Sequence, residues 1–293
     1  MSKRMLGDIA IDVAIEIAVD DGFPPEMLVP DHDPAILEAN RALIQPFCVN
    51  PTTGGLKLSI HTWIVKTGKQ TILIDTCNGN HKERPNFELA HHLNQPYLER
   101  LAAAGVHPDE VDIVLCTHLH VDHCGWNTQL KNGKWVPTFP NAKYIFSRAE
   151  HDQWNPLAPG HDESPVNLGV FNDSVLPVIE AGQAELIDGV HGLNDNMVIK
   201  PAAGHTRGSI LMEVQSKGHH AVFAGDTLHS PIQILRPEWS SGFCGDPVKS
   251  AQVRRRLMEH CVEHNALLMP AHFPPPHAVR VRADGNNFTF TPE

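Results

Sequence analysis

Residues Cys116–Trp126 read CTHLHVDHCGW, which places three histidines and an aspartate between positions 118 and 123. Imidazole and carboxylate groups at this density indicate either a metal site or a run of polar residues on a loop. One loop cannot complete a metal shell, because the remaining ligands must come from distant segments that the fold brings together. A metal-binding reading therefore requires an architecture in which several separated polar residues meet this loop.

Three further polar residues stand where such an architecture would place ligands. Each follows a short apolar stretch and lies beside a glycine or another small residue: His205 in AAGHTRGS, Asp226 in FAGDTLH and His272 in MPAHFP. The stretches before them, residues 197–201, 221–224 and 267–269, are predicted strands. Loops at the ends of strands carry much of the chemistry of proteins, so these residues are candidate ligands.

Within the histidine-rich loop, His118 and His120 are one residue apart on a predicted extended stretch. Their rings should point the same way, with Leu119 turned into the core. Asp122 and His123 follow as the chain bends and would face a second position. The full candidate set is His118, His120, Asp122, His123, His205, Asp226 and His272. These seven ligands are too many for one tetrahedral ion and suit two adjacent divalent ions, zinc by preference, with manganese, iron or cobalt as alternatives.

Strands and helices alternate along the chain in a pattern typical of an α/β protein. Predicted strands cover residues 9–19, 58–66, 71–75 and 112–117, followed by short strands in AKYIFSR, GQAELID, NMVIKPA, SILMEVQ, HAVFAGD and ALLMPAH. Predicted helices cover residues 35–43, 97–104, RAEHDQW and 247–263. This order favours two sheets with helices on their outer faces, in one layered domain over residues 1–293. Residues 1–45 would add an N-terminal strand and a lid.

Composition narrows the class of partner and the compartment. Hydrophobic residues make up 41% of 293, enough for a sizeable core, and the formal net charge of −11 disfavours nucleic acid. The arginines at 254–256 are expected to form a solvated helix face with acidic neighbours. Six scattered cysteines without a C-x-x-C pair indicate free thiols, and no secretory core or membrane span is evident. We expect a cytoplasmic protein without a membrane partner.

The motif His118-Leu119-His120-Val121-Asp122-His123, followed by separated histidine, aspartate and histidine, resembles the metallo-β-lactamase superfamily. The likeness extends from LIDTC at Asp75 to AH at His272, and it implies a four-layer αββα sandwich. By this resemblance the ligands divide into two sets, with Asp226 bridging the ions: His118, His120 and His205 for one metal, and Asp122, His123 and His272 for the other.

Within that superfamily the spacing resembles the dinuclear lactonases and the methyl-parathion-hydrolase-like enzymes. Lactonases that act on acyl-homoserine lactones carry a tyrosine three residues after the bridging aspartate, where this chain has His229. Two smaller departures are Cys77, where DTG is usual, and Arg207, where GHTPGS is usual. The substitution at 229 favours the parathion-hydrolase-like branch, and none of the departures removes a ligand.

The resemblance implies a hydrolase in which a metal-bridging hydroxide, its pKa lowered towards ~7, attacks a lactone or a carboxylic ester. The candidate catalytic residues are Asp122, Asp226 and His229, with His229 donating to the developing oxyanion or, alternatively, bonding only to backbone. Asp75 would accept a ring N–H from a ligand histidine or merely cap a turn. Cys124 is expected to be an inert thiol.

Several alternatives remain open from the sequence. The same metal machinery suits a phosphotriesterase and, less well, an exported β-lactamase, while a mononuclear-iron persulfide dioxygenase belongs to a different class. The expected partner is a small-molecule ester or lactone, neutral or cationic because the protein is acidic. A homodimer is one option for the oligomeric state.

Overall fold

The computed structural model describes residues 3–45 and 47–293 and divides them into two compact units. Unit 1 comprises Met1–Glu16 and Ile60–His191, and unit 2 comprises Ile17–Ser59 and Gly192–Glu293. Each unit is described by itself below. That the chain forms one domain, with residues 1–45 as a strand and lid extension, stays a prediction.

The first sheet supplies the framework of unit 1. It has seven strands in the order β1-β2-β3-β4-β5-β8-β9 and is mixed, since β3 and β4 are antiparallel whereas β4, β5, β8 and β9 are parallel. Its strands are β1 (Arg4–Leu6), β2 (Ile9–Phe23), β3 (Leu56–Lys66), β4 (Thr71–Ile74), β5 (Ile113–Leu115), β8 (Lys143–Ser147) and β9 (Ala184–Ile187). A separate hairpin pairs β6 (Thr128–Lys131) with β7 (Lys134–Pro137).

The parallel pairing of β4 with β5 brings two candidate segments to one edge of this sheet. Ile74 pairs with Leu115, so the chain after each strand leaves the sheet at the same end. Asp75 directly follows β4, and the histidine-rich loop follows β5. The apolar runs that predict these strands thus also fix which polar residues meet.

The second sheet belongs to unit 2 apart from its first residue, His191. Its order is β10-β11-β12-β13-β14-β15-β16. The strands are β10 (His191–Asn194), β11 (Met197–Pro201), β12 (Ile210–Ser216), β13 (His219–Gly225), β14 (Leu267–Pro270), β15 (Val279–Asp284) and β16 (Asn287–Pro292). β12 is antiparallel to both β11 and β13, and β13 is parallel to β14. Strands β11, β13 and β14 therefore run the same way, and the segments that follow them begin at a common edge.

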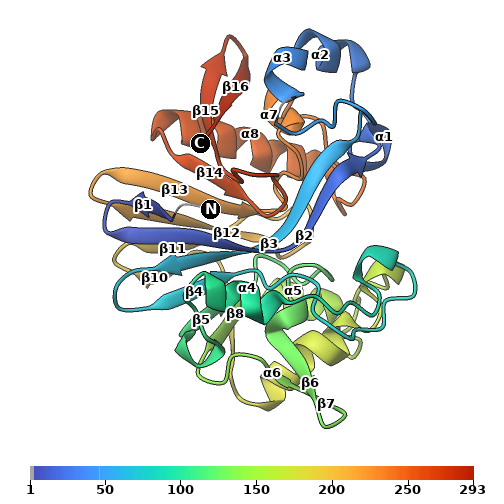
Figure 1. The fold of residues 1–293 in the computed structure, drawn as a ribbon, viewed down its shortest axis with the longest axis vertical. Coiled ribbons are helices and arrows are strands. Elements are labelled where there is room, and N and C mark those ends of the chain that lie inside the picture. Colours follow the sequence, from blue (N-terminus) through green and yellow to red (C-terminus); the bar gives the residue numbers. More distant parts are fainter. Residues whose placement is uncertain (1–2, 46) are drawn as a thin grey trace. The chain divides into compact units, whose positions relative to one another are not determined.

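Helices accompany both sheets. Unit 1 contains α4 (Tyr97–Ala103), α5 (Arg148–Trp154) and α6 (Leu176–Glu180), the last preceded by a π-helical turn at Phe171–Val175. Unit 2 contains α1 (Pro25–Leu28), α2 (Pro34–Ala39), α3 (Arg41–Ile44), α7 (Ile232–Leu235) and α8 (Pro247–Glu263). Figure 1 shows α8 beside β14 and β15, where its buried face, including Leu257 and Met258, joins the apolar core of the unit. Among the described residues, no helix is long and apolar enough to cross a membrane.

Most of the predicted elements are confirmed. The helix expected at residues 35–43 is instead two short helices, α2 and α3, because Asn40 ends the first and precedes the second. The hairpin β15–β16 was not predicted, although Val279 and Val281 on one strand and Phe288 and Phe290 on the other are buried with a period of two, and Val281 pairs with Phe290. A closer reading of that alternation would have found it.

The expectation that residues 254–256 form a solvated face is wrong for Arg254. Its side chain is fully buried, and its guanidinium donates to the carbonyl oxygens of Thr227, Pro237 and Trp239. The irregular chain between β13 and α8 leaves these carbonyls without strand or helix partners, and Arg254 satisfies them. Burial lowers the pKa of Arg254 to about 10.

Candidate metal centre

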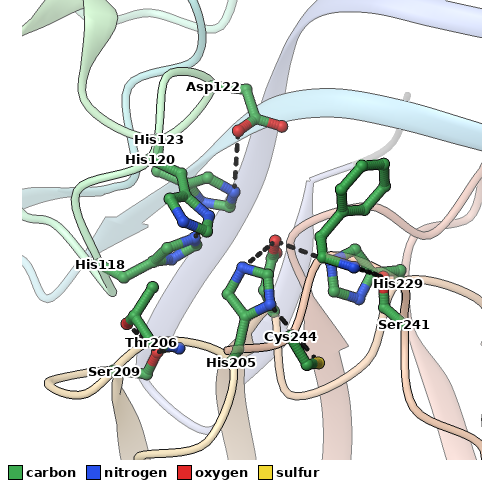
Figure 2. Close-up of polar contacts among 12 residues, drawn as sticks. His118, His120, Asp122, His123, His205, Thr206, Ser209, His229, Ser241 and Cys244 are labelled. Carbon is green, nitrogen blue, oxygen red and sulfur yellow. Dashed lines mark hydrogen bonds and ion pairs between the residues drawn. The ribbon is translucent and has the colours of Figure 1, made fainter. Parts of the chain in front are cut away.

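Four candidate ligands of unit 1, His118, His120, Asp122 and His123, form what we call the loop cluster. His118 Nε2 lies 3.0 Å from His120 Nδ1, and the two rings meet edge to face with their centroids 4.6 Å apart. Leu119, between them, is fully buried, as the extended geometry predicts. Asp122 Oδ1 lies 3.5 Å from His123 Nε2, as Figure 2 shows.

Asp75 determines which ring nitrogens of the loop cluster carry protons. Its Oδ2 accepts from His123 Nδ1 at 2.9 Å, which leaves Nε2 of that ring for a ligand. Oδ2 also accepts from the Thr117 hydroxyl at 2.8 Å, and this hydroxyl oxygen lies 3.2 Å from His118 Nδ1. Because the hydroxyl proton points to Asp75, Thr117 Oγ1 can accept from His118 Nδ1. Asp75 thus sets one tautomer directly and a second through Thr117.

The buried carboxylate of Glu16 joins the segment after β4 to the segment that follows the loop cluster. It accepts from the backbone N–H of Asn78 at 2.9 Å and from the Trp126 indole at 2.6 Å. Burial raises the pKa of Glu16, although these donors oppose the shift. The two segments touch so closely that a Cβ on Gly125 would lie 1.7 Å from the Asn78 carbonyl oxygen. Only glycine fits there.

Four residues of unit 2, His205, Asp226, His229 and His272, form what we call the strand-end cluster. They follow β11, β13 and β14, as predicted from the apolar stretches before them. Asp226 lies at the centre: its Oδ2 is 3.3 Å from His205 Nε2 and 3.1 Å from His229 Nε2, and its Oδ1 is 3.0 Å from His272 Nε2. All four side chains are at least 94% buried.

The opposite nitrogens in two of these rings have their own partners. His272 Nδ1 lies 3.1 Å from the backbone carbonyl oxygen of Ser59, which can only accept, so Nδ1 donates. His205 Nδ1 lies 3.7 Å from the Cys244 sulfur (Figure 2). In both rings the Nε2 atom is therefore the one presented to Asp226.

His229 was predicted either to act in the site or to bond only to backbone, and the structure places its ring beside Asp226. Its plane is stacked on that of His272, with centroids 5.6 Å apart and an angle of 16°. Its buried Nδ1 has no hydrogen-bond partner among the residues that the structure describes. Its backbone N–H donates to Gln233 Oε1 at 2.7 Å, which fixes the main chain.

Neutral imidazoles do not by themselves satisfy these contacts. A neutral imidazole carries one N–H, yet His123 faces Asp75 and Asp122 from its two nitrogens, and His272 faces Ser59 and Asp226. The second nitrogen of each ring then directs a lone pair at a carboxylate. Two ligands about 2.1 Å from one tetrahedral zinc ion lie roughly 3.4 Å apart, close to the separations observed within each cluster. The donors present fit divalent metal ions.

The cysteines near the clusters have the character of inert thiols. Cys124 and Cys77 are fully buried, and burial raises the pKa of each well above its usual value. A thiol that stays protonated is a poor metal ligand. None of the cysteines in the described chain forms a disulfide, which agrees with the free thiols expected from the sequence.

Three supporting residues were not found by sequence reasoning: Glu16, Glu150 and Asn167. Glu16 lies 110 residues from its partner Trp126, and Asn167 lies 48 residues from the main-chain carbonyl that it contacts. No local pattern marks such residues, because each is an isolated polar side chain whose partner is fixed only by the tertiary fold. Glu16 shares its face of β2 with Ala10, Asp12 and Ala14, so the strand pattern gives no signal for it either.

Solved structures resemble the whole chain. The hydrolase AbOPH of the beta lactamase superfamily superposes with a TM-score of 0.79 at 25% identity, covering 99% of this chain and 96% of that one. AidC, a dizinc quorum-quenching lactonase, gives a TM-score of 0.78 at 20% identity, covering 100% and 97%. The predicted αββα architecture is that of the fold they share, which here contains two mixed sheets with accompanying helices.

A curated relative and a family match complete the comparison. The hydroxyacylglutathione hydrolase of Aeromonas salmonicida (strain A449) is 32% identical over 135 residues, which span 46% of this chain and 39% of that protein. Residues 56–272 match the family described as the metallo-beta-lactamase superfamily, and this range contains every candidate ligand. The chain belongs to the metallo-beta-lactamase superfamily of metal-dependent hydrolases.

Proposed function

We propose that the protein hydrolyses a lactone or a carboxylic ester with two divalent metal ions, zinc by preference. The loop cluster and the strand-end cluster would together supply the ligands, which requires that they share one centre. The proposed sets are His118, His120 and His205 with Asp226 for one ion, and Asp122, His123 and His272, again with Asp226, for the other.

The observation that carries this proposal is the arrangement of imidazoles around Asp226. Three Nε2 atoms lie within 3.3 Å of its two oxygens. At least one of these rings, that of His272, already donates its N–H to another acceptor. A carboxylate surrounded in this way, and itself 6% exposed, suits a bridging ligand between two cations. A catalytic zinc ion keeps one coordination position for water, which it activates, whereas a structural zinc ion has all its positions filled by protein ligands.

The comparisons support the same class without deciding the substrate. AidC is a dizinc quorum-quenching lactonase, solved in complex with a product, N-hexnoyl-L-homoserine, and it resembles this chain in fold at 20% identity. The relative from Aeromonas salmonicida is named for the hydrolysis of a glutathione thioester, over a matched segment that covers only part of that protein. Lactones, esters and thioesters share an attacked carbonyl carbon, so we propose carbonyl hydrolysis as the common chemistry.

Two divalent ions bound here would supply hydroxide at neutral pH and polarise the substrate oxygen. The chain's own residues prepare the site for them. Asp75 holds His123 and, through Thr117, His118 with Nε2 unprotonated. Asp226 and Asp122 provide negative charge, and His229 would donate a hydrogen bond to the oxyanion that develops on the substrate. One such donor typically contributes about 3–4 kcal/mol to transition-state stabilisation.

Metal analysis combined with a substrate panel tests this proposal. We expect two equivalents of zinc per chain, no turnover after chelation, and recovery of activity when zinc is restored. The panel contains γ-lactones, aryl esters, an acyl thioester, a β-lactam and a phosphotriester, each in neutral and anionic forms where the chemistry allows. Full turnover by metal-free protein would overturn the proposal. Preference for the phosphotriester would replace the substrate class, and one iron per chain with oxygen uptake on a persulfide would indicate a dioxygenase.

The His229→Phe variant tests the role proposed for that residue. Phenylalanine keeps the stacking on His272 but removes both ring nitrogens, so kcat should fall about a hundredfold while KM changes little. Steady-state kinetics on the best substrate of the panel measure both. A rise in KM at unchanged kcat would show that His229 only binds substrate.

A further inference from the structure

We infer that Glu150 and Asn167 are positioning residues that clamp the peptide of Leu119 and thereby set the separation of His118 and His120. This inference rests on the proposed function, since it assumes that these two histidines are ligands of one ion. It assigns a task to two buried polar side chains that the proposed mechanism does not use.

The clamp consists of one hydrogen bond on each side of the same residue. The Leu119 backbone N–H donates to Glu150 Oε2 at 2.9 Å, and the Leu119 carbonyl oxygen accepts from Asn167 Nδ2 at 3.0 Å. Glu150 is fully buried, and Asn167 is only 8% exposed. Leu119 lies outside strands and helices, so these two side chains supply the backbone hydrogen bonds that a sheet would otherwise provide.

Glu150 is itself fixed at the start of α5. Its backbone N–H donates to the Ser147 hydroxyl at 3.1 Å, which caps the helix, and its Oε2 also accepts from the Trp154 indole at 3.0 Å. The Trp154 ring in turn meets the His120 ring edge on, with centroids 5.2 Å apart. The Glu150 carboxylate therefore holds both the backbone of Leu119 and the Trp154 ring that contacts His120.

The clamp lies between His118 and His120 and therefore affects the position of both rings. On an extended stretch, residues either side of a central residue project to the same face, so a rotation of the Leu119 peptide planes moves His118 and His120 together. Their ligand nitrogens lie 3.0 Å apart, and a tetrahedral ion tolerates little change in that distance. Loss of the clamp should weaken the site that these histidines share more than the site formed by Asp122 and His123.

A purely structural role for Glu150 is the competing explanation, and metal retention separates the two. We would measure the stepwise zinc affinity by competition with a chromophoric chelator, and the visible spectrum of the cobalt-substituted protein, for Glu150→Ala, Glu150→Gln and Asn167→Ala. Asp33→Ala is the control, because it removes the side-chain cap of a helix in unit 2, α2, and leaves Leu119, Glu150 and Ser147 intact. Thermal unfolding of each metal-free variant reports stability separately.

Glu150→Ala should weaken the binding of one of the two ions about 10–100-fold and shift the cobalt spectrum, while the other ion keeps its affinity. Glu150→Gln retains an acceptor oxygen and should restore most of the loss. Asp33→Ala should lower the unfolding temperature and leave both affinities unchanged.

Asn167→Ala covers the case in which Glu150→Ala does not fold, and it should weaken the same ion by a smaller factor. Unchanged affinities in Asn167→Ala and in any folded Glu150 variant would overturn the inference, as would equal weakening of both ions. If the wild-type protein binds fewer than two ions, the proposed function fails instead, and the clamp variants play no part in that result.

Discussion

The two candidate clusters are built in different ways. The loop cluster takes its four residues from one stretch of six positions, and single buried side chains hold that stretch: Asp75, Glu16 and Glu150 each accept from it or from its flanks. The strand-end cluster takes its residues from the ends of three strands, and the pairing of β11, β12, β13 and β14 sets their spacing. A backbone carbonyl lies beside Nδ1 of His272, and a thiol beside Nδ1 of His205.

This difference implies a different sensitivity to mutation. A loop held by buried carboxylates depends on residues that are not ligands, since the loss of one leaves a buried N–H unsatisfied. A cluster placed by strand register depends mainly on its own side chains, because sheet pairing is shared among many hydrogen bonds. Variants that leave every ligand intact should therefore damage the loop cluster more than the strand-end cluster.

The largest effect should come from the residue that joins the proposed sites. Asp226→Ala removes the carboxylate that contacts three imidazoles, so we expect loss of both ions and at least about a thousandfold lower kcat/KM. His118→Ala should release one ion and retain the other. Zinc content and kinetics of the two purified variants measure this, and equal zinc loss in both would show that the two proposed metal sites are not independent.

A smaller effect distinguishes the supports of the two clusters. Asp75→Asn offers an amide N–H where His123 needs an acceptor, so it should favour the wrong tautomer and lower metal affinity about 10–100-fold. Cys244→Ser, at the corresponding position beside His205, should leave metal affinity unchanged because the 3.7 Å contact is weak. Chelator competition measures the zinc affinity of both variants. A larger loss of affinity in Cys244→Ser than in Asp75→Asn would contradict the expected difference between the clusters.

The smallest effect concerns stability at alkaline pH. Burial raises the pKa of Cys48 and Cys261 to about 12 from an ordinary value of 9.0. A raised pKa in the folded state means that the folded protein keeps protons that the unfolded chain releases. The free energy of unfolding should therefore fall between about pH 9 and pH 12.

Cys261→Ala tests this on the metal-free protein, away from both clusters. The variant loses some core packing at every pH, but its unfolding free energy should decline less steeply above pH 9 than that of the wild type. Denaturant titrations of both proteins at pH 8 and pH 10.5 give the fall in unfolding free energy for each. If the unfolding free energy falls equally in both proteins, this thiol does not contribute to the loss of stability at alkaline pH.

The sequence predicts the candidate ligands well because their positions follow from local patterns. Apolar stretches place His205, Asp226 and His272 after strands, and the extended spacing of His118 and His120 predicts that their rings share a face. The hairpin β15–β16 was also accessible to the same reasoning. The supports of the loop cluster were not, since Glu150 meets the backbone of Leu119 across 31 residues through a single side chain.

Arg254 shows the same limit from another direction. Helical periodicity distributes three consecutive arginines around α8 and favours a solvated face, but it carries no information on which loop packs against the helix. The carbonyl oxygens of Thr227, Pro237 and Trp239 decide the orientation of Arg254, and their need for a donor arises only once that loop is folded. Residues that satisfy irregular backbone are therefore the least predictable part of this molecule.

The discontinuity of unit 2 has a consequence for biosynthesis. Its chain is interrupted by the whole of residues 60–191, so a ribosome delivers every residue of the loop cluster, with Asp75, Glu150 and Asn167, long before His272 leaves the exit tunnel. A nascent chain can thus shape the first cluster while the second still lacks its last histidine. Under the proposed function, capture of both metal ions would wait until that residue has emerged.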